Sequence, residues 1–285
     1  MNFTHTIDTS LANKIQNLLS ILRTHAPLLI SYSGGLDSSL LAVFTREYLG
    51  PHALTCILLD GPSFSRRSFH EAVRIAEEYS LPLDIVPHEF LSDPVLTHNP
   101  PDRCRICKKK MFTILAEKAR KYQSRSIADG AHTSDCTEYR PGIEEMTRHG
   151  VIHPFIMADI TKEDIRMIAK VKGYSFWNKP SSACLLSRIP YDTAITKEIL
   201  MMIEKGEEIL INHGFLECRV RHHNEIARIE VPPIHMEKIL LQKEKIVKEF
   251  HEIGFSYTCL DLEGYRSGSF DKVLGNHTKT HPSKS

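Results

Sequence analysis

Residues 28–38 read LLISYSGGLDS, and this segment constrains the fold more than any other part of the chain. An apolar stretch typical of a buried strand runs directly into two glycines, and the helical pattern SSLLAVFTREYL follows. Gly34 and Gly35 lack a Cβ, so the backbone can turn sharply and approach an anion. The helix that they open begins with unpaired N–H groups and the positive end of its dipole. The segment therefore predicts a strand–turn–helix unit that cradles phosphate.

The side chains around the two glycines favour the same kind of ligand. Ser33 and Ser38 supply hydroxyl groups, and Asp37 lies in the first turn of the expected helix. No lysine follows the glycines, so the segment is not a P-loop of the G-x-x-x-x-G-K-[ST] kind. A tight turn without a ligand is the alternative, but the serines and the aspartate favour phosphate. We expect five residues to bind a nucleotide: Ser33, Gly34, Gly35, Asp37 and Ser38.

The composition of the 285 residues argues against several classes of protein. A formal net charge of +1, with acids and bases interspersed, gives no long-range field that attracts a nucleic acid. The segment MNFTHTIDTS lacks the features of a secretory signal, and no apolar run reaches membrane-spanning length. Seven cysteines in such a chain favour reduced thiols over disulfides. We expect a cytoplasmic protein with neither a nucleic-acid nor a membrane partner.

Helical and strand patterns alternate along the first half of the chain. We expect helices at 9–24, 38–48, 69–79 and 104–122, and strands at 28–32, 54–60, 82–90 and 126–130. This alternation predicts a doubly wound, parallel α/β sheet, which binds ligands beyond the carboxyl ends of its strands. Ser33, Asp60 and Asp129 fall at three such ends. We expect Asp60 and Asp129 to face the nucleotide, with Asp129 holding ribose hydroxyls or magnesium; a loop cap is the alternative for Asp129.

The alternation of helices and strands that predicts the parallel sheet ends near residue 190, where we place a domain boundary. Thr161 and Asp164 resemble a capping box for a helix at 162–172. The segment WNKPSSACLLSRIPYD that follows is bracketed by prolines and is too broken for a regular element. Beyond it, helices at 196–213 and 235–252 and strands at 216–222, 226–231 and 255–262 predict a small α+β unit. We expect an ATP-binding domain at 1–190, a substrate or oligomerisation domain at 191–270 and a disordered tail at 271–285.

Three cysteines stand out from the other four. Cys104 and Cys107 form a C-x-x-C pair at the start of an expected helix, whose dipole favours thiolate. Half a zinc site, a redox pair or two buried cysteines are the alternatives for the pair. Cys184 lies in the proline-bracketed loop, beside Ser182, Ser187 and Arg188, where a structural cysteine has little to pack against. By contrast, Cys56 lies inside an apolar strand and is expected to be part of the core.

The number of these cysteines bears on the group that they could bind. Three thiolates without a fourth suit a cubane iron–sulfur cluster with one open iron, whereas structural zinc needs four ligands. His98 could supply a fourth ligand, so zinc stays an alternative.

Two arginines in the second unit are candidates for binding phosphate. Strand alternation places Arg219 and Arg221 on one face, and two guanidinium groups side by side suit a phosphate monoester. The alternative is a solvated strand face on which they pair with Glu217 or Glu230.

Together these motifs resemble one branch of the PP-loop ATP pyrophosphatase superfamily, the LarE sulfur transferases. The matching strings run from about residue 28 to 270: SGGLDSS, NPPDRCRICKK, YRPG, WNKPSSACLLSRIPY, RVRHH, ARIEV and LDLEGYRSGS. The resemblance implies a Rossmann-like fold and an ATP-dependent sulfurtransferase that builds the nickel-pincer cofactor of lactate racemase. ATP, with magnesium, adenylates a carboxylate of pyridinium-3,5-biscarboxylic acid mononucleotide, and sulfur then displaces AMP.

The same resemblance implies two possible sources of the sulfur. In one form of the family, three cysteines matching Cys104, Cys107 and Cys184 hold a 4Fe-4S cluster that carries an extra sulfide. In the other form, the cysteine matching Cys184 gives up its own sulfur and becomes dehydroalanine. The C-x-x-C pair favours the cluster form. The resemblance also implies a separate sulfur donor and a homo-oligomer.

The resemblance also assigns the site for the substrate phosphate. Arg219 and Arg221 match positions that hold this phosphate, and we expect Ser187 and Arg188 at the same site. The segment ADGAHTSDC departs from the family pattern D-G-T-N-x-D-D, which affects Asp129 and Asp135. A tRNA thiolase with a three-cysteine cluster and a non-catalytic zinc protein that binds nucleotides are the alternative functions.

Overall fold

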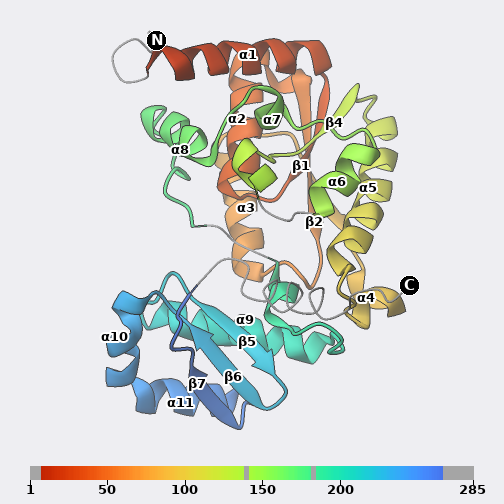
Figure 1. The fold of residues 1–285 in the computed structure, drawn as a ribbon. Helices are drawn as coiled ribbons and strands as arrows, with labels where there is room; N and C mark the ends of the chain where they lie inside the picture. Colours follow the sequence, from red (N-terminus) through yellow and green to blue (C-terminus); the bar gives the residue numbers. More distant parts are fainter. Residues whose placement is uncertain (1–7, 138–140, 181–183, 266–285) are drawn as a thin grey trace, which may run out of the picture. The chain divides into compact units, whose positions relative to one another are not determined.

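The computed structural model describes residues 8–137, 141–180 and 184–265, which form two compact units (Figure 1). The first unit comprises Met1–Gly61, Arg66–His88 and Asp102–Ser182. The second comprises Pro62–Ser65, Glu89–Pro101 and Ala183–Ser285. The tail expected at 271–285 lies outside the described residues, as do Ser182 and part of the YRPG string.

A four-stranded parallel sheet forms the centre of the first unit. Its strands are β1 (Leu28–Tyr32), β2 (Leu54–Asp60), β3 (Leu83–Pro87) and β4 (Ser126–Ala128), in the order β3-β2-β1-β4. The chain moves outward in one direction from β1 to β3 and returns to the other side of β1 at β4. This confirms the doubly wound α/β fold and places its topological switch point between β1 and β4.

Helices cover both faces of this sheet. They are α1 (Thr9–His25), α2 (Leu36–Leu49), α3 (Arg66–Glu78), α5 (Arg103–Lys121), α6 (Pro141–Arg148), α7 (Pro154–Met157) and α8 (Lys162–Val171). Figure 1 shows α5 and α6 on one side of the sheet and α2 and α8 on the other. Leu29 and Ile57 pack with Leu115 of α5 and Met146 of α6. Because neighbouring strand residues point to opposite faces, Leu28 and Ile30, which are also buried, face the other helices.

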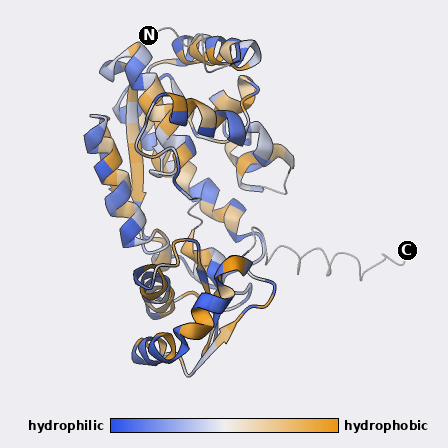
Figure 2. Ribbon diagram, turned by 90° about the vertical axis from the view of Figure 1, so that its left-hand side faces the viewer, coloured by the Kyte–Doolittle hydropathy of each residue, from blue (hydrophilic) through white to orange (hydrophobic). Residues whose placement is uncertain are grey.

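The hydropathy pattern agrees with this layering. Figure 2 shows the strands of the first unit mostly orange, whereas the helices change between orange and blue along their length. Continuous apolar strands are typical of parallel sheets that helices cover on both faces. The predicted capping box of α8 is also present, with Thr161 and Asp164 each bonding the other's backbone N–H. None of the described helices combines the length and apolar character needed to cross a bilayer.

The second unit is the small α+β unit that was expected. Its sheet contains β5 (Arg219–His223), β6 (Ile226–Glu230) and β7 (Tyr257–Leu260), with β5 and β6 antiparallel and β6 and β7 parallel. Alternate strand residues such as Val220 and Ile229 pack with Leu210 of α9 (Lys197–Asn212) and with Phe250. The short helix α4 (Pro94–Thr97) also belongs to this unit.

The prediction of a single helix over 235–252 is wrong. The structure has two helices, α10 (Met236–Leu241) and α11 (Lys243–Glu252), separated by Gln242. The Gln242 side chain contacts His213 Nδ1 at 2.8 Å, and Glu249 of α11 contacts His213 Nε2 at 2.9 Å. The apolar spacing continues across the break, so the sequence pattern does not reveal it.

Candidate functional site

The turn between β1 and α2 has the backbone that the two glycines predicted. Gly34 has a φ of +64°, in the left-handed region that favours glycine. A Cβ at Gly34 would lie 2.3 Å from the Cβ of Ala72 on α3. Glycine is therefore required at position 34 for two reasons, the left-handed dihedral angle and the close approach of α3.

Hydroxyl groups hold the turn at the start of α2. Ser38 Oγ accepts a hydrogen bond from the Ser33 N–H at 3.2 Å and lies 3.1 Å from Ser33 Oγ. Gly35 is the N-cap of α2 and provides no side-chain cap. The turn thus presents two hydroxyls and the positive end of a helix dipole, the usual setting for a bound phosphate group.

Two lysines that the sequence analysis did not single out lie at this turn. Lys162 of α8 forms an ion pair with Asp37 in the first turn of α2. The Lys179 side chain is 7% exposed, and its ammonium donates to the Gly34 carbonyl at 2.8 Å and pairs with Glu71 at 2.9 Å. Burial lowers the pKa of Lys179, and Glu71 partly opposes that shift. Because both lysines come from segments far along the chain, the local sequence of the turn does not predict them.

Asp60 and Asp129 lie at strand ends, as expected, and both have partners. Asp60 forms an ion pair with Arg66 at the start of α3. Asp129 lies 2.7 Å from His153 Nδ1 and accepts the Ala131 N–H at 3.1 Å. Asp129 therefore caps its own loop, which was the alternative considered for it. It directly follows β4, the strand that pairs with β1.

The structure places the three cysteines in different settings. Cys104 is exposed and Cys107 is half-buried; three residues apart near the start of α5, they lie on one face of the helix. Cys184 is exposed and belongs to the second unit. No group of three or more His, Cys, Asp or Glu side chains that could hold a metal occurs among the described residues. The 4Fe-4S cluster therefore stays a prediction. Cys56 is buried, as expected of a core residue.

The backbone of Cys184 is tightly bound although its thiol is exposed. Its carbonyl accepts hydrogen bonds from the Ser187 N–H at 3.0 Å, from Ser187 Oγ at 2.8 Å and from Arg188 Nη1 at 3.1 Å. The next residue, Leu185, donates its N–H to the Ser63 carbonyl at 3.0 Å. The thiol is thus presented from a fixed turn.

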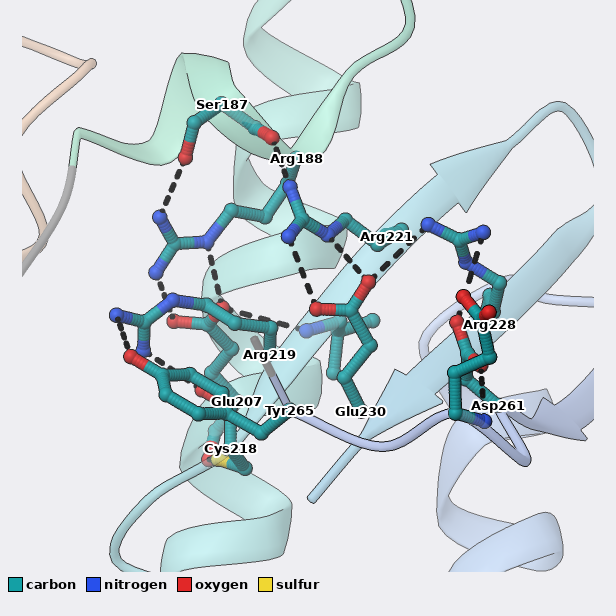
Figure 3. Close-up of polar contacts among 12 residues, drawn as sticks. Ser187, Arg188, Glu207, Cys218, Arg219, Arg221, Arg228, Glu230, Asp261 and Tyr265 are labelled. Atoms are coloured by element: carbon teal, nitrogen blue, oxygen red, sulfur yellow. Dashed lines mark hydrogen bonds and ion pairs between the residues drawn. The ribbon is translucent and has the colours of Figure 1, made fainter. Parts of the chain in front are cut away.

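Arginines and carboxylates alternate in the second unit beside this turn (Figure 3). Arg188, 2% exposed, forms two hydrogen bonds with Glu207 of α9, at 2.8 and 3.2 Å. Arg221 forms two with Glu230, at 2.9 Å each, and also donates to the Ser187 carbonyl. Pairing with Glu230 was the alternative considered for Arg221. Both pairs are bidentate, the strong geometry for arginine and carboxylate.

Arg219 has a different environment from Arg221. Its Nη1 donates to the Cys218 carbonyl at 2.8 Å, its Nη2 donates to the Tyr265 hydroxyl at 3.0 Å, and its guanidinium lies 4.9 Å from the centre of the Tyr265 ring. Burial, followed by the nearby Arg188 cation, lowers the pKa of Arg219. An anion at this position would offset both the burial of the charge and the repulsion from Arg188.

Comparison with known proteins identifies the family, although no family model matches the chain. Over 265 residues the chain is 31% identical to pyridinium-3,5-bisthiocarboxylic acid mononucleotide synthase of Lactiplantibacillus plantarum, covering 93% of this chain and 96% of that protein. The chain belongs to the LarE family. An uncharacterised protein of Synechocystis sp. is 33% identical over 266 residues, which cover 93% of this chain and 99% of that protein.

A more distant relative matches about half of this LarE-family chain. A glutamine-hydrolysing GMP synthase component of Methanopyrus kandleri is 27% identical over 158 residues, 51% of this chain and 49% of that protein. The Lactiplantibacillus relative confirms the resemblance to LarE that the motifs indicated. Because the Lactiplantibacillus relative is a synthase, family membership supports an enzymatic role for this chain.

Proposed function

We propose that the chain is an ATP-dependent sulfurtransferase in the synthesis of the nickel-pincer cofactor. It adenylates carboxylates of pyridinium-3,5-biscarboxylic acid mononucleotide, forming pyrophosphate, and then replaces AMP with sulfur. The turn at 33–38 carries the proposal, because its left-handed glycine, its hydroxyls and its helix N-terminus suit a polyphosphate. The Lactiplantibacillus relative, a synthase of the bisthiocarboxylic acid mononucleotide, supports this choice of substrate.

The residues at and beside the turn at 33–38 fit ATP with magnesium. The N–H groups that open α2 and the hydroxyls of Ser33 and Ser38 would bind phosphate oxygens, and Asp129 offers a carboxylate for magnesium or a ribose hydroxyl. When bound, magnesium neutralises charge on the phosphates and on the leaving pyrophosphate. A carboxylate is a poor electrophile, so adenylation supplies the leaving group that sulfur attack requires.

We propose that the second unit binds the phosphate of the mononucleotide at Arg219. Arg188 and Arg221 surround this position but are already bonded to Glu207 and Glu230. Their role here is to fix the turn of Cys184, because Arg188 donates to the Cys184 carbonyl and Arg221 to the Ser187 carbonyl. Ser187, which bonds to the Cys184 carbonyl and to Arg188, lies in the same turn.

For the sulfur source we propose the three-cysteine 4Fe-4S cluster, with sacrifice of Cys184 as the alternative. Cys104 and Cys107 supply two thiols on one helical face, and Cys184 supplies a third. Iron and sulfide analysis of protein purified anaerobically separates the two routes, and Cys104→Ala should remove a brown colour. Equimolar zinc in colourless protein after iron–sulfur reconstitution would contradict the cluster. In the sacrificial route, the intact mass falls by one hydrogen sulfide, localised to Cys184.

Exchange of labelled pyrophosphate into ATP, dependent on the dicarboxylate mononucleotide, tests the adenylation. We expect Asp37→Ala to abolish the exchange, because Asp37 joins Lys162 at the start of α2. Glu163→Ala, an exposed acid next to Lys162, is the matched control and should retain it. An unchanged rate in Asp37→Ala would exclude the adenylation role of this site. AMP formation that requires tRNA would favour a tRNA thiolase, and ATP binding without AMP would favour a non-catalytic protein.

A further inference from the structure

Lys179 follows α8 in the chain, and its buried ammonium bonds to the backbone of the turn at 33–38. It donates to the Gly34 carbonyl at 2.8 Å and pairs with Glu71 of α3 at 2.9 Å. The side chain is only 7% exposed, so most of its contact with water is lost. Taking a cation out of water costs free energy, in keeping with the lowered pKa of Lys179. The adenylation chemistry gives this buried charge no role of its own.

The segment that carries Lys179 is anchored to α3. The ring of Phe176, 2% exposed, lies 5.5 Å from the ring of Tyr79, the residue after α3. The Lys179 N–H donates to the Phe176 carbonyl at 3.1 Å. Helix α3 also supplies Glu71 and its neighbour Ala72, against which Gly34 is packed. Lys179 thus ties the turn to α3 where the two elements approach closely.

The bond to the Gly34 carbonyl also sets the direction of the next N–H group. Gly34 C=O and Gly35 N–H belong to one trans peptide group, so they point in opposite directions. The Gly34 residue is buried, whereas the Gly35 N–H donates to Ser33 Oγ, 3.4 Å away, on the exposed side of the turn. Lys179 therefore holds the carbonyl on the buried side, and the N–H faces the side that a ligand can reach.

This peptide group has little of its own to resist rotation. It lies between two glycines, neither of which has a Cβ that restricts the backbone dihedral angles. A rotated peptide would present the Gly34 carbonyl to the ligand side. A carbonyl oxygen only accepts hydrogen bonds, as phosphate oxygens do, so the rotated turn would repel phosphate.

We propose that Lys179 is a positioning residue of the ATP site. It holds the Gly34 carbonyl inside the protein, so that the Gly35 N–H donates to a phosphate oxygen. This inference rests on the proposed function and adds a residue to its site. Lys179 acts through the backbone, since its ammonium is buried and bonded to Gly34 and Glu71.

Two substitutions separate the bond to the carbonyl from the ion pair. Lys179→Met keeps the apolar part of the side chain and removes the ammonium, whereas Glu71→Gln removes the ion pair and keeps the bond to Gly34. Binding of magnesium–ATP, inorganic pyrophosphate and adenosine to the full chain is measured by calorimetry. We expect Lys179→Met to weaken ATP and pyrophosphate about tenfold, or about 1.4 kcal/mol, and to leave adenosine unchanged. Glu71→Gln should stay within about threefold of the unsubstituted protein for all three ligands.

A conservative variant tests for rescue. Lys179→Arg keeps a donor for the Gly34 carbonyl and should bind pyrophosphate more tightly than Lys179→Met. If Lys179→Met does not fold, Lys179→Gln, whose side-chain nitrogen is one bond nearer to the backbone, takes its place with the same expected result.

Three results would overturn the inference. The first is undiminished pyrophosphate binding by Lys179→Met, and the second is a loss of adenosine affinity equal to the loss for pyrophosphate. The third is an equal loss of pyrophosphate affinity in Lys179→Met and in either Glu71→Gln or Lys179→Arg, since the bond to the carbonyl would then not decide binding. If the unsubstituted protein binds neither ATP nor pyrophosphate, the proposed function fails, which is a distinct result.

Discussion

Arg188 and Glu207 are joined by two hydrogen bonds, Nε to Oε1 at 2.8 Å and Nη2 to Oε2 at 3.2 Å. The remaining nitrogen, Nη1, donates to the carbonyl of Cys184 at 3.1 Å. The ion pair therefore ties the turn that presents the Cys184 thiol to helix α9 (Figure 3). A substitution of Glu207 should therefore change both the stability of the protein and the position of the Cys184 turn.

We expect Glu207→Gln to destabilise the protein by about 3–5 kcal/mol, because it leaves the Arg188 charge buried without its counter-ion. Urea unfolding followed by circular dichroism measures the change. Glu208→Gln, a neighbour on α9 that forms no part of this pair, is the control and should differ from the unsubstituted protein by less than about 0.5 kcal/mol. Equal stability of the two variants would mean that the pair does not hold the turn.

Arg219 and Arg221 should behave differently although they alternate on one strand. Arg221→Gln leaves the fully buried Glu230 with Arg228, 3.1 Å away, as its remaining ion-pair partner, so we expect a loss of about 2–3 kcal/mol in unfolding free energy. For Arg219→Gln we expect a loss nearer to about 1 kcal/mol and at least about tenfold weaker binding of the mononucleotide substrate. Urea unfolding and calorimetric titration with the substrate make the comparison. Undiminished binding by Arg219→Gln would refute the phosphate assignment.

Gly34→Ala should abolish ATP binding and cost about 2–5 kcal/mol, the sum of a left-handed backbone and an overpacked contact with Ala72. Gly150→Ala is the matched control, since Gly150 has a φ of +83° but no atom within 4 Å of the added Cβ. The control should lose only about 1–2 kcal/mol and bind ATP normally. Thermal unfolding with and without ATP tests both variants, and equal costs would show that the contact with α3 tolerates a methyl group.

Stability should fall as the pH drops below about 6.5, the usual pKa of histidine, partly because of His222. This side chain is 5% exposed, and burial lowers its pKa, with partial opposition from a backbone hydrogen bond. A lowered pKa means that the unfolded chain takes up the proton first. The stabilisation is therefore complete above about 6.5 and is lost as the pH falls through the pKa of the folded state. The difference between the unfolding free energies at about pH 7.5 and about pH 5.5 should therefore be smaller in His222→Phe than in the unsubstituted protein. His52→Gln, at an exposed histidine, is the control and should leave this difference unchanged.

Local patterns predicted the central sheet well and the second unit less well. The ranges 28–32 and 54–60 match β1 and β2 because strands covered on both faces are continuous apolar runs with clear ends. The expected strand 216–222 begins later, at Arg219, and the helix over 235–252 is interrupted at Gln242. Both differences depend on contacts that the local pattern does not encode.

The glycine turn at 33–38, the parallel sheet and the LarE family could all be predicted from the order of the amino acids, because glycine dihedral angles, strand burial and helix starts are local properties of the chain. Which charges meet is a property of the folded protein. Lys162 pairs with Asp37 across 125 residues, and Arg221 is bound by Glu230 while Arg219 is bonded to Cys218 and Tyr265. Ion pairing depends on distance through space, and the fold sets that distance.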